Sequence, residues 1–277
     1  MKFSLQAKKS LGQHFLRSEK ALSAIVDAGD IHADDIVLEI GPGEGVLTER
    51  LLKLAGKVIA VEKDPRSVVL IQEKFAEEIK EGKLDVIEKD ILEFDLRDFK
   101  PLSLANSAAP LSRGASQYKV IANIPYYITG AILEHFLQTD FQPELMVLLV
   151  QKEVAKRIIA RDKKESILSM SVKVYGDPTL IQIVPRGAFA PAPTVDSAIL
   201  LIDHVSKQNL DGVHDAHYFN ILKHGFAHKR KKLIKNLEEI SNGATLKSIF
   251  ESLNIDENTR AEDLSLDQWI AIAKLIK

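Results

Sequence analysis

The sequence predicts an α/β fold, in which a largely parallel sheet has helices on both faces and a smaller all-α domain follows it. Two observations support this prediction. Up to about residue 203, short apolar runs alternate with segments of helical period, a pattern typical of right-handed βαβ units. Beyond a polar linker at 204–213, every periodic segment is helical. We therefore expect a sheet domain at 1–203 and a helical domain at 204–277.

Composition limits the class of protein. Of 277 residues, 45% are hydrophobic and 27% are charged, and the net charge is −2, as is ordinary for a soluble protein. The absence of cysteine excludes disulfides, thiolate zinc sites and cysteine nucleophiles. The basic N-terminus lacks the apolar core of a signal peptide, and the longest apolar run, at 145–150, is too short to cross a bilayer. We expect a cytoplasmic protein without membrane contact, and a monomer.

Caps and helix breakers set the ends of the first elements. Ser18 is an N-cap signal for a helix to residue 28, Gly56 ends the helix that starts at 46, and Pro65 begins a helix to about 80. A further helix follows Thr129, and a basic one follows residue 150. The expected strands between these helices are 35–40, 57–61, 84–87, 118–122 and 145–150.

The rest of the chain is less regular. The stretch 101–117 is rich in Ser, Ala, Pro and Gly and predicts a surface loop. Residues 167–203 are expected to be mostly β, with one strand antiparallel at the sheet edge; the strands would be 171–175, 180–184 and 197–202. Ser265 and Gln268 fit a capping box. The expected helices of the second domain are 215–227, 229–240, 244–253 and 265–276.

A glycine-rich turn joins the strand at 35–40 to its helix. It reads Gly-Pro-Gly-Glu-Gly at 41–45, and glycine lets the backbone approach a ligand closely. Glu62 ends the next strand, at the usual place for a carboxylate on a ribose diol. A nicotinamide enzyme would show the spacing G-x-G-x-x-G around a pyrophosphate. Here the spacing is G-x-G-x-G, with Glu39 before it and Glu44 inside it, which suits a positively charged ligand such as S-adenosylmethionine.

The turn at 123–127, Asn-Ile-Pro-Tyr-Tyr, follows another strand, at the end where open α/β sheets bind ligands. An amide, bare carbonyls and aromatic rings suit a flat, hydrogen-bonding ligand such as a nucleobase. The alternative is a simple strand-to-helix turn with two half-buried tyrosines, and Tyr127 is expected in the core. Asp90 ends a third strand and could accept a hydrogen bond from an adenine amine. A single carboxylate is often only solvated, but Gly41, Glu62, Asp90 and Asn123 follow successive strands.

Five segments in order carry a resemblance to a known family. They are KSLGQHFL at 9–16, LEIGPG at 38–43, NIPYY at 123–127, VQKEVA at 150–155 and FAPAPTVDS at 189–197. With these segments the chain resembles the small-subunit ribosomal RNA adenine N6,N6-dimethyltransferases over nearly its whole length. The resemblance implies a Rossmann-like methyltransferase that uses S-adenosylmethionine. It further implies dimethylation of two adjacent adenosines in the 3′-terminal hairpin of 16S rRNA, late in small-subunit assembly.

The resemblance also implies roles by position. The N-terminal segment 1–17 would line the cofactor pocket, Gly41 would approach the methionine part, Glu62 the ribose and Asp90 the adenine ring. Asn123 would lie between the cofactor and the target base. The cofactor-binding residues expected in this way are His14, Leu16, Glu39, Gly41, Gly43, Glu62, Asp90 and Asn123.

The expected chemistry is alignment rather than base catalysis, because adenine N6 needs its lone pair aimed at a sulfonium methyl. The side-chain oxygen of Asn123 and the carbonyl of Ile124 would accept the two N6 hydrogens. Pro125 would fix the turn, while aromatic rings would stack on the two faces of the extruded base. The residues expected at the reacting base are Asn123, Ile124, Pro125, Tyr126 and Phe189.

Two groups of basic residues are candidate contacts for RNA phosphates, although a solvated helix face is the usual alternative. The denser group is Lys223, His224, His228, Lys229, Arg230, Lys231, Lys232 and Lys235. The other group is Lys152, Lys156, Arg157, Arg161, Lys163 and Lys164.

Other functions fit part of the pattern. The large-subunit rRNA adenine methyltransferases of macrolide resistance share the fold and an Asn-x-Pro-Tyr motif, but the PAPTVDS stretch at 191–197 favours the small-subunit group. An assembly factor that needs no catalysis, and a nicotinamide dehydrogenase, are further alternatives. His214, His217, His224 and His228 lack carboxylates at ligand spacing, so no metal is expected.

Overall fold

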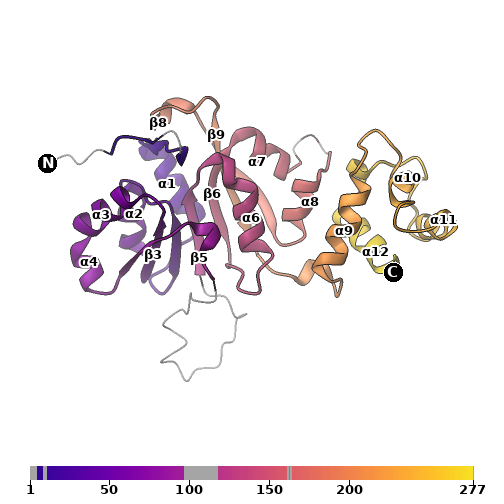
Figure 1. Ribbon diagram of the computed structural model, residues 1–277, viewed down its shortest axis with the longest axis horizontal. Helices are drawn as coiled ribbons and strands as arrows, with labels where there is room; N and C mark the ends of the chain where they lie inside the picture. Colours follow the sequence, from indigo (N-terminus) through magenta and orange to yellow (C-terminus); the bar gives the residue numbers. More distant parts are fainter. Residues whose placement is uncertain (1–4, 9–10, 97–117, 161, 163, 277) are drawn as a thin grey trace, which may run out of the picture. The chain divides into compact units, whose positions relative to one another are not determined.

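The computed structural model describes residues 5–8, 11–96, 118–160, 162 and 164–276 (Figure 1). The predicted surface loop at 101–117, and Arg161 and Lys163 of the second basic group, lie outside the described residues. Two compact units make up the chain: Met1–Ala155 with Thr179–Val205, and Lys156–Pro178 with Ser206–Lys277. No helix among the described residues is long and apolar enough to cross a membrane.

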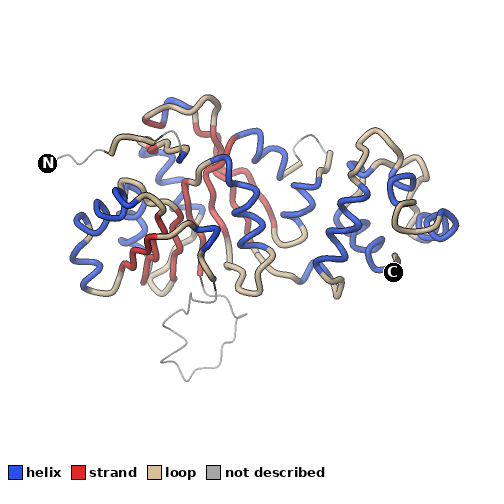
Figure 2. The backbone as a smooth tube through the Cα atoms, in the orientation of Figure 1, coloured by secondary structure: helices blue, strands red, loops and turns tan. Residues whose placement is uncertain are grey.

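A sheet of seven strands, in the order β4-β3-β2-β5-β6-β9-β7, forms the centre of the fold. Figure 2 draws the strands in red. The strands from β4 to β6 are parallel, and β9 runs antiparallel to β6. Parallel strands end at the same edge, which is where the predicted polar residues gather. The strands are β2 (Ile36–Ile40), β3 (Lys57–Glu62), β4 (Leu84–Glu88), β5 (Tyr118–Asn123), β6 (Met146–Gln151), β7 (Asp177–Val184) and β9 (Ser197–Asp203).

Helices flank this sheet, as the alternating pattern predicts (Figure 1). Ser18 caps the first of them through its side chain, as predicted, and Pro65 opens α3 after the N-cap Asp64. The predicted helix 65–80 is two helices, because the chain leaves helical geometry at Phe75, whose ring is buried. The helices are α1 (Glu19–Ala28), α2 (Val46–Leu54), α3 (Pro65–Lys74), α4 (Ala76–Lys80), α6 (Thr129–Leu137) and α7 (Lys152–Ile158).

The N-terminal segment is held by a small second sheet. Its strand β1 (Phe15–Leu16) pairs antiparallel with β8 (Phe189–Ala190), so that Leu16 lies opposite Phe189. Both β1 side chains are buried, as their apolar character predicts. Leu16 and Phe189 join the main hydrophobic core with side chains of α1, α2 and the central strands. This pairing connects residues that are far apart in the sequence, and it places the N-terminal segment beside the sheet.

The second unit is helical around Trp269, which is fully buried and stacks on Phe226 with ring centroids 5.4 Å apart. The predicted capping box of Ser265 and Gln268 is present. The predicted strand at 171–175 is wrong, because Ser166 and Ser169 form a capping box that starts a helix there. The helices are α8 (Ile167–Lys173), α9 (Asp215–Gly225), α10 (Leu233–Leu237), α11 (Gly243–Ser252) and α12 (Leu266–Leu275).

Candidate cofactor and target-base site

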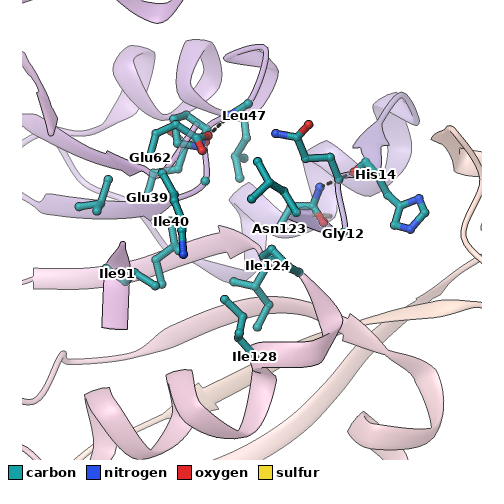
Figure 3. Close-up of a pocket in the computed structure, with 18 of the residues that line it drawn as sticks. Gly12, His14, Glu39, Ile40, Leu47, Glu62, Ile91, Asn123, Ile124 and Ile128 are labelled. Carbon is teal, nitrogen blue, oxygen red and sulfur yellow. Dashed lines mark hydrogen bonds between the residues drawn. The ribbon is translucent and has the colours of Figure 1, made fainter. Parts of the chain in front are cut away.

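A cavity of about 330 Å³ opens at the carboxyl ends of the central parallel strands (Figure 3). Glu39 and Glu62 lie on one side of it, and Asn123 lies on the other, beside the N-terminal segment. The predicted residues that line it are His14, Leu16, Glu39, Gly41, Gly43, Glu62, Asp90, Asn123, Ile124, Pro125 and Tyr126. One fold therefore brings together nearly every candidate for cofactor binding and for holding the base.

The glycine-rich turn bends around the end of β2 in left-handed backbone conformations. Gly41 has φ +66° and Gly43 has φ +57°, angles that other residues rarely adopt. A Cβ at Gly41 would point into open space, whereas one at Gly43 would lie 3.1 Å from the Phe15 ring. The turn therefore needs glycine for its backbone angles, and at Gly43 also for its contact with the N-terminal segment.

Glu62 is a fixed carboxylate at the end of β3. The backbone N–H of Gly43 donates to its Oε2 over 3.2 Å, and the N–H of Asp64 donates to its Oε1 over 2.8 Å. Burial raises the pKa of Glu62, although these backbone donors oppose the shift. Because both oxygens are tied, the side chain has a single orientation, and the remaining lone pairs can accept from a diol.

Glu39 is a buried acid with an unpaired oxygen. The residue is 1% exposed, and its Oε2 has no hydrogen-bond partner among the described residues. Burial raises the pKa of Glu39 to about 8, and the neighbouring Glu62 carboxylate adds to the shift. An unsatisfied buried carboxyl oxygen is costly. Its position on the cavity wall therefore fits a bound cation or hydrogen-bond donor, such as S-adenosylmethionine would bring.

Asp90 is already engaged at both carboxylate oxygens. Its Oδ1 accepts from the backbone N–H of Leu92 over 3.1 Å, and its Oδ2 accepts from Lys63 Nζ over 2.6 Å. The Lys63 ammonium lowers the pKa of Asp90. Lys63 was not predicted from sequence, yet it lines the cavity. An adenine amine that binds Asp90 has to share one of these oxygens with Leu92 or with Lys63.

Asp64 anchors the N-terminal segment to the cavity wall. Arg66 forms a fork of hydrogen bonds to its carboxylate, Gln13 Nε2 donates to Oδ2 over 3.1 Å, and Lys8 Nζ lies 3.4 Å from Oδ1. The Asp64 side chain is fully covered. A second carboxylate, Glu44, accepts from Arg17 over 2.6 Å. Asp64 could not be predicted as an anchor from sequence, because its partners Lys8 and Gln13 are distant in the chain. Its only local signal is its place two residues after Glu62.

Replacing Asp64 by alanine is expected to weaken the attachment of the N-terminal segment to the cavity wall. The free energy of unfolding should fall by about 2 kcal/mol at neutral pH, since charge-assisted hydrogen bonds are lost, and the cofactor dissociation constant should rise about tenfold. Arg66 and Gln13 hold the pKa of Asp64 well below its usual range. The carboxylate therefore stabilises the fold above its ordinary pKa of 3.8, and this contribution is lost as the pH falls.

Calorimetric unfolding across pH 2–7 checks this prediction. Asp85→Ala is the matched control, because Asp85 pairs with Lys57 at the opposite end of the strands. If Asp64→Ala and Asp85→Ala behave alike, or if the Asp64 difference does not shrink between pH 7 and pH 2, the anchoring role is wrong.

The turn after β5 contributes two acceptors at the cavity, the side-chain oxygen of Asn123 and the backbone carbonyl of Ile124. Asn123 Nδ2 donates to the backbone carbonyl of His14 over 3.1 Å. The carbonyl of Ile124 accepts no hydrogen bond from the described residues, and Pro125 has no N–H to offer. Tyr126 lies in a 3₁₀ turn, and its hydroxyl is hydrogen-bonded to Ser197 Oγ over 2.5 Å. The side chain of Tyr126 is therefore fixed beside the two acceptors.

Two aromatic predictions differ from the structure. Tyr127 is 67% exposed, so its predicted place in the core is wrong. Consecutive residues of a 3₁₀ turn point about 120° apart, and Tyr126 takes the inward direction. Phe189 is buried in the core beside Leu16 and does not line the cavity. The His14 ring instead lies near-parallel to that of Tyr126, at a centroid distance of 6.0 Å.

The histidines of the second unit have other partners. His214 Nδ1 accepts from the backbone N–H of Ala216, and His217 Nε2 is bonded to backbone carbonyls of the last helix. Within the part of the chain that the structure describes, no group of three or more His, Asp or Glu side chains could hold a metal ion.

Comparison with known proteins decides the family. The sequence model described as "Ribosomal RNA adenine dimethylase" matches residues 4–277. The chain belongs to this family. It is therefore an S-adenosylmethionine-dependent rRNA adenine dimethyltransferase, and the cavity with the buried, unpaired Oε2 of Glu39 fits that cofactor.

Relatives of similar length support this membership. The "Ribosomal RNA small subunit methyltransferase A" of Dehalococcoides mccartyi is 41% identical over 270 residues, which cover 96% of this chain and 87% of that protein. The protein of the same name from Nostoc sp. is 38% identical and covers 98% of each chain.

Solved structures share the fold of this dimethyltransferase. A dimethyladenosine transferase from Plasmodium falciparum superposes with a TM-score of 0.76 at 25% identity, over 94% of this chain and 96% of that one. The 23S rRNA methyltransferase ErmE gives a TM-score of 0.74 at 22% identity, over 95% and 99% of the two chains. The predicted Rossmann-like methyltransferase fold is thus confirmed.

Proposed function

We propose that this enzyme dimethylates N6 of two adjacent adenosines in the 3′-terminal hairpin of 16S rRNA, late in assembly of the small ribosomal subunit. The observation that carries the proposal is the pair of free acceptors, Asn123 Oδ1 and the Ile124 carbonyl, in the same cavity as the buried glutamates. The names of the full-length relatives support the small subunit as the substrate. We further propose that it acts in the cytoplasm as a monomer.

The cofactor would be held by the strand ends. The fixed carboxylate of Glu62 would accept from the ribose hydroxyls, and Asp90 would accept from the adenine amine. Glu39 would face the charged methionine part across the open turn at Gly41. When bound, S-adenosylmethionine supplies an electrophilic methyl group on a sulfonium. The wall formed by Leu11, Gly12 and Gln13 would keep water from that side of the cavity.

The target base would be aligned by the turn after β5. Asn123 Oδ1 and the Ile124 carbonyl would accept the two N6 hydrogens, which favours a pyramidal nitrogen whose lone pair points at the methyl group. Tyr126 would stack on the extruded base, worth about 1–3 kcal/mol. Because Phe189 lies in the core, it does not cover the other face of the base.

Transfer of a labelled methyl group tests the substrate. The purified enzyme is incubated with labelled S-adenosylmethionine and undermethylated 30S subunits, and the modified nucleoside is identified. Label in N6,N6-dimethyladenosine of the 3′-terminal hairpin is the expected result. Label in 23S rRNA only would favour the large-subunit alternative. Binding to 30S subunits without any transfer would favour the assembly factor that needs no catalysis.

The RNA-binding surface is proposed to be the turn between α9 and α10. Residues 227–232 are all exposed, and no ion pair within the described residues engages Lys229, Arg230 or Lys231. The buried Asn236 holds this turn, because its Nδ2 donates to the carbonyls of Gly225 and His228 over 2.6 and 3.2 Å. In the other basic group, Lys152 pairs with Asp196 and Lys164 with Asp263. Lys235 of the first group pairs with Glu238, so it is the turn at 227–232 that is better placed for phosphates.

Neutralising this turn is expected to weaken RNA binding. The triple change of Lys229, Arg230 and Lys231 to Gln should lower affinity for 30S subunits about 10- to 100-fold near physiological salt and reduce the salt slope by about 2–3. The matched control changes the exposed Lys20, Lys53 and Lys80 to Gln, which alters the net charge equally. Affinities measured at several salt concentrations decide between phosphate contacts and a solvated surface, for which the two triple variants would behave alike.

A further inference from the structure

The side-chain amide of Asn123 is held in one orientation by the N-terminal segment. Its Nδ2 lies 3.1 Å from the carbonyl oxygen of His14, and because a carbonyl only accepts, the amide nitrogen rather than Oδ1 faces it. Oδ1 is therefore turned the other way, and it accepts no hydrogen bond among the described residues. A flipped amide would present a donor to the adenine amine, itself a donor, so this orientation is the productive one.

The side chain of His14 anchors the same carbonyl. Its Nδ1 lies 2.8 Å from the carbonyl oxygen of Pro191, so Nδ1 carries the hydrogen. Figure 3 shows the imidazole directed away from Asn123 while the His14 backbone faces it. One residue thus binds the loop after β8 through its ring and Asn123 through its backbone. The preceding Gly12 has φ +61°, so the chain reaches His14 through a turn rather than a strand.

We propose that His14 is a positioning residue for methyl transfer: its hydrogen bond to Pro191 sets the carbonyl that turns Asn123 Oδ1 toward the target amine. The inference rests on the proposed function, because it presupposes that Asn123 receives N6. In this role the His14 ring acts through Asn123. Losing its ring hydrogen bond therefore slows methyl transfer more than it weakens cofactor binding.

Steady-state kinetics on 30S subunits test this with three variants. His14→Leu keeps the approximate size of the side chain without the donor, and it is expected to lower kcat about tenfold while the KM for S-adenosylmethionine changes less than about threefold. His14→Asn places Nδ2 where Nδ1 was and should keep kcat within about threefold of the wild type. His32→Leu, at an exposed histidine of the same unit, is the matched control and should leave both constants unchanged.

A double-mutant cycle and an NMR measurement separate positioning from general damage. If His14 acts through Asn123, adding His14→Leu to Asn123→Ala should cost no further activity. In the free protein with ¹⁵N-labelled asparagine, the Asn123 side-chain NH₂ should exchange with solvent faster in His14→Leu than in wild type or His14→Asn. The exchange measurement needs no turnover, and it also shows whether each variant is folded.

Several outcomes would overturn the inference. They are wild-type kcat in His14→Leu, equal losses in His14→Leu and His14→Asn, a raised KM with unchanged kcat, unchanged NH₂ exchange, or full additivity in the cycle. Wild-type activity in Asn123→Ala is different, because it would overturn the proposed role of Asn123 itself. An inactive Asn123→Ala with unaffected His14 variants overturns this inference alone.

Discussion

Asn123→Ala is expected to lower the rate of methyl transfer by about 10²–10³-fold and to leave the protein folded. The effect is large because the Asn123 oxygen would act only on the aligned amine, and removing one preorganised polar group from a transition state typically costs this much. The affinity for S-adenosylmethionine should change less than about threefold, since Glu39, Glu62 and Asp90 remain. Single-turnover rates on 30S subunits, with calorimetry for cofactor binding, measure both quantities.

The chain offers a matched control for this change. Asn209 Nδ2 donates to the backbone carbonyl of Lys173 over 3.2 Å, the same kind of bond that Asn123 makes to His14. Asn209→Ala should leave the rate of methyl transfer at the wild-type value. Asn123→Asp adds a further comparison, because it keeps an acceptor oxygen but loses the donor to His14. If Asn123→Ala turned over normally, the proposed holding of the target amine would be refuted.

Glu39→Gln is expected to stabilise the free protein and to weaken cofactor binding. Burial raises the pKa of Glu39 to about 8 from the ordinary 4.5, so the folded protein keeps a proton that the unfolded chain releases. The free energy of unfolding of the wild type therefore falls as the pH rises from 4.5 to 8, and it levels above that. A glutamine does not titrate, so its advantage should grow over this window to on the order of 4 kcal/mol.

Folding favours the protonated form of Glu39, whereas binding of the cofactor should favour its charged form. A cationic ligand favours the Glu39 carboxylate, so binding S-adenosylmethionine at pH 6–7.5 should release a proton, and its affinity should rise with pH. Glu39→Gln should release none and should bind about tenfold more weakly. Titration calorimetry in buffers of different ionisation enthalpy measures the protons.

Glu49→Gln is the control for this prediction, since Glu49 lies exposed on α2 and its pKa is lowered by Lys74. Equal proton release in wild type and Glu39→Gln would show that another group titrates. A constant difference in stability between the two proteins over pH 4.5–8 would show that Glu39 is charged throughout.

Local sequence rules predicted most helix ends and the order of the site residues along the chain. Ser18, Gly56, Pro65 and Ser265 act on their own neighbours in the chain, so local rules place the helix ends near them. Strand ends in a parallel sheet share one edge, and this is why Gly41, Glu62 and Asn123 could be expected together before any coordinates. The order of the five motifs along the chain indicated the family in the same way, since it needs no knowledge of distances in space.

Which polar atoms are free and which are hydrogen-bonded depends on contacts between distant parts of the chain. Asp64 gathers Lys8 and Gln13 across more than fifty positions of sequence, and Lys63 occupies an oxygen of Asp90. Phe189 lies in the core because β8 pairs with β1. Tyr127 is exposed because consecutive residues of the 3₁₀ turn point in different directions. Residue type and spacing predict which groups meet at a sheet edge. Hydrogen-bond partners and burial depend on contacts between distant segments, which a local pattern does not encode.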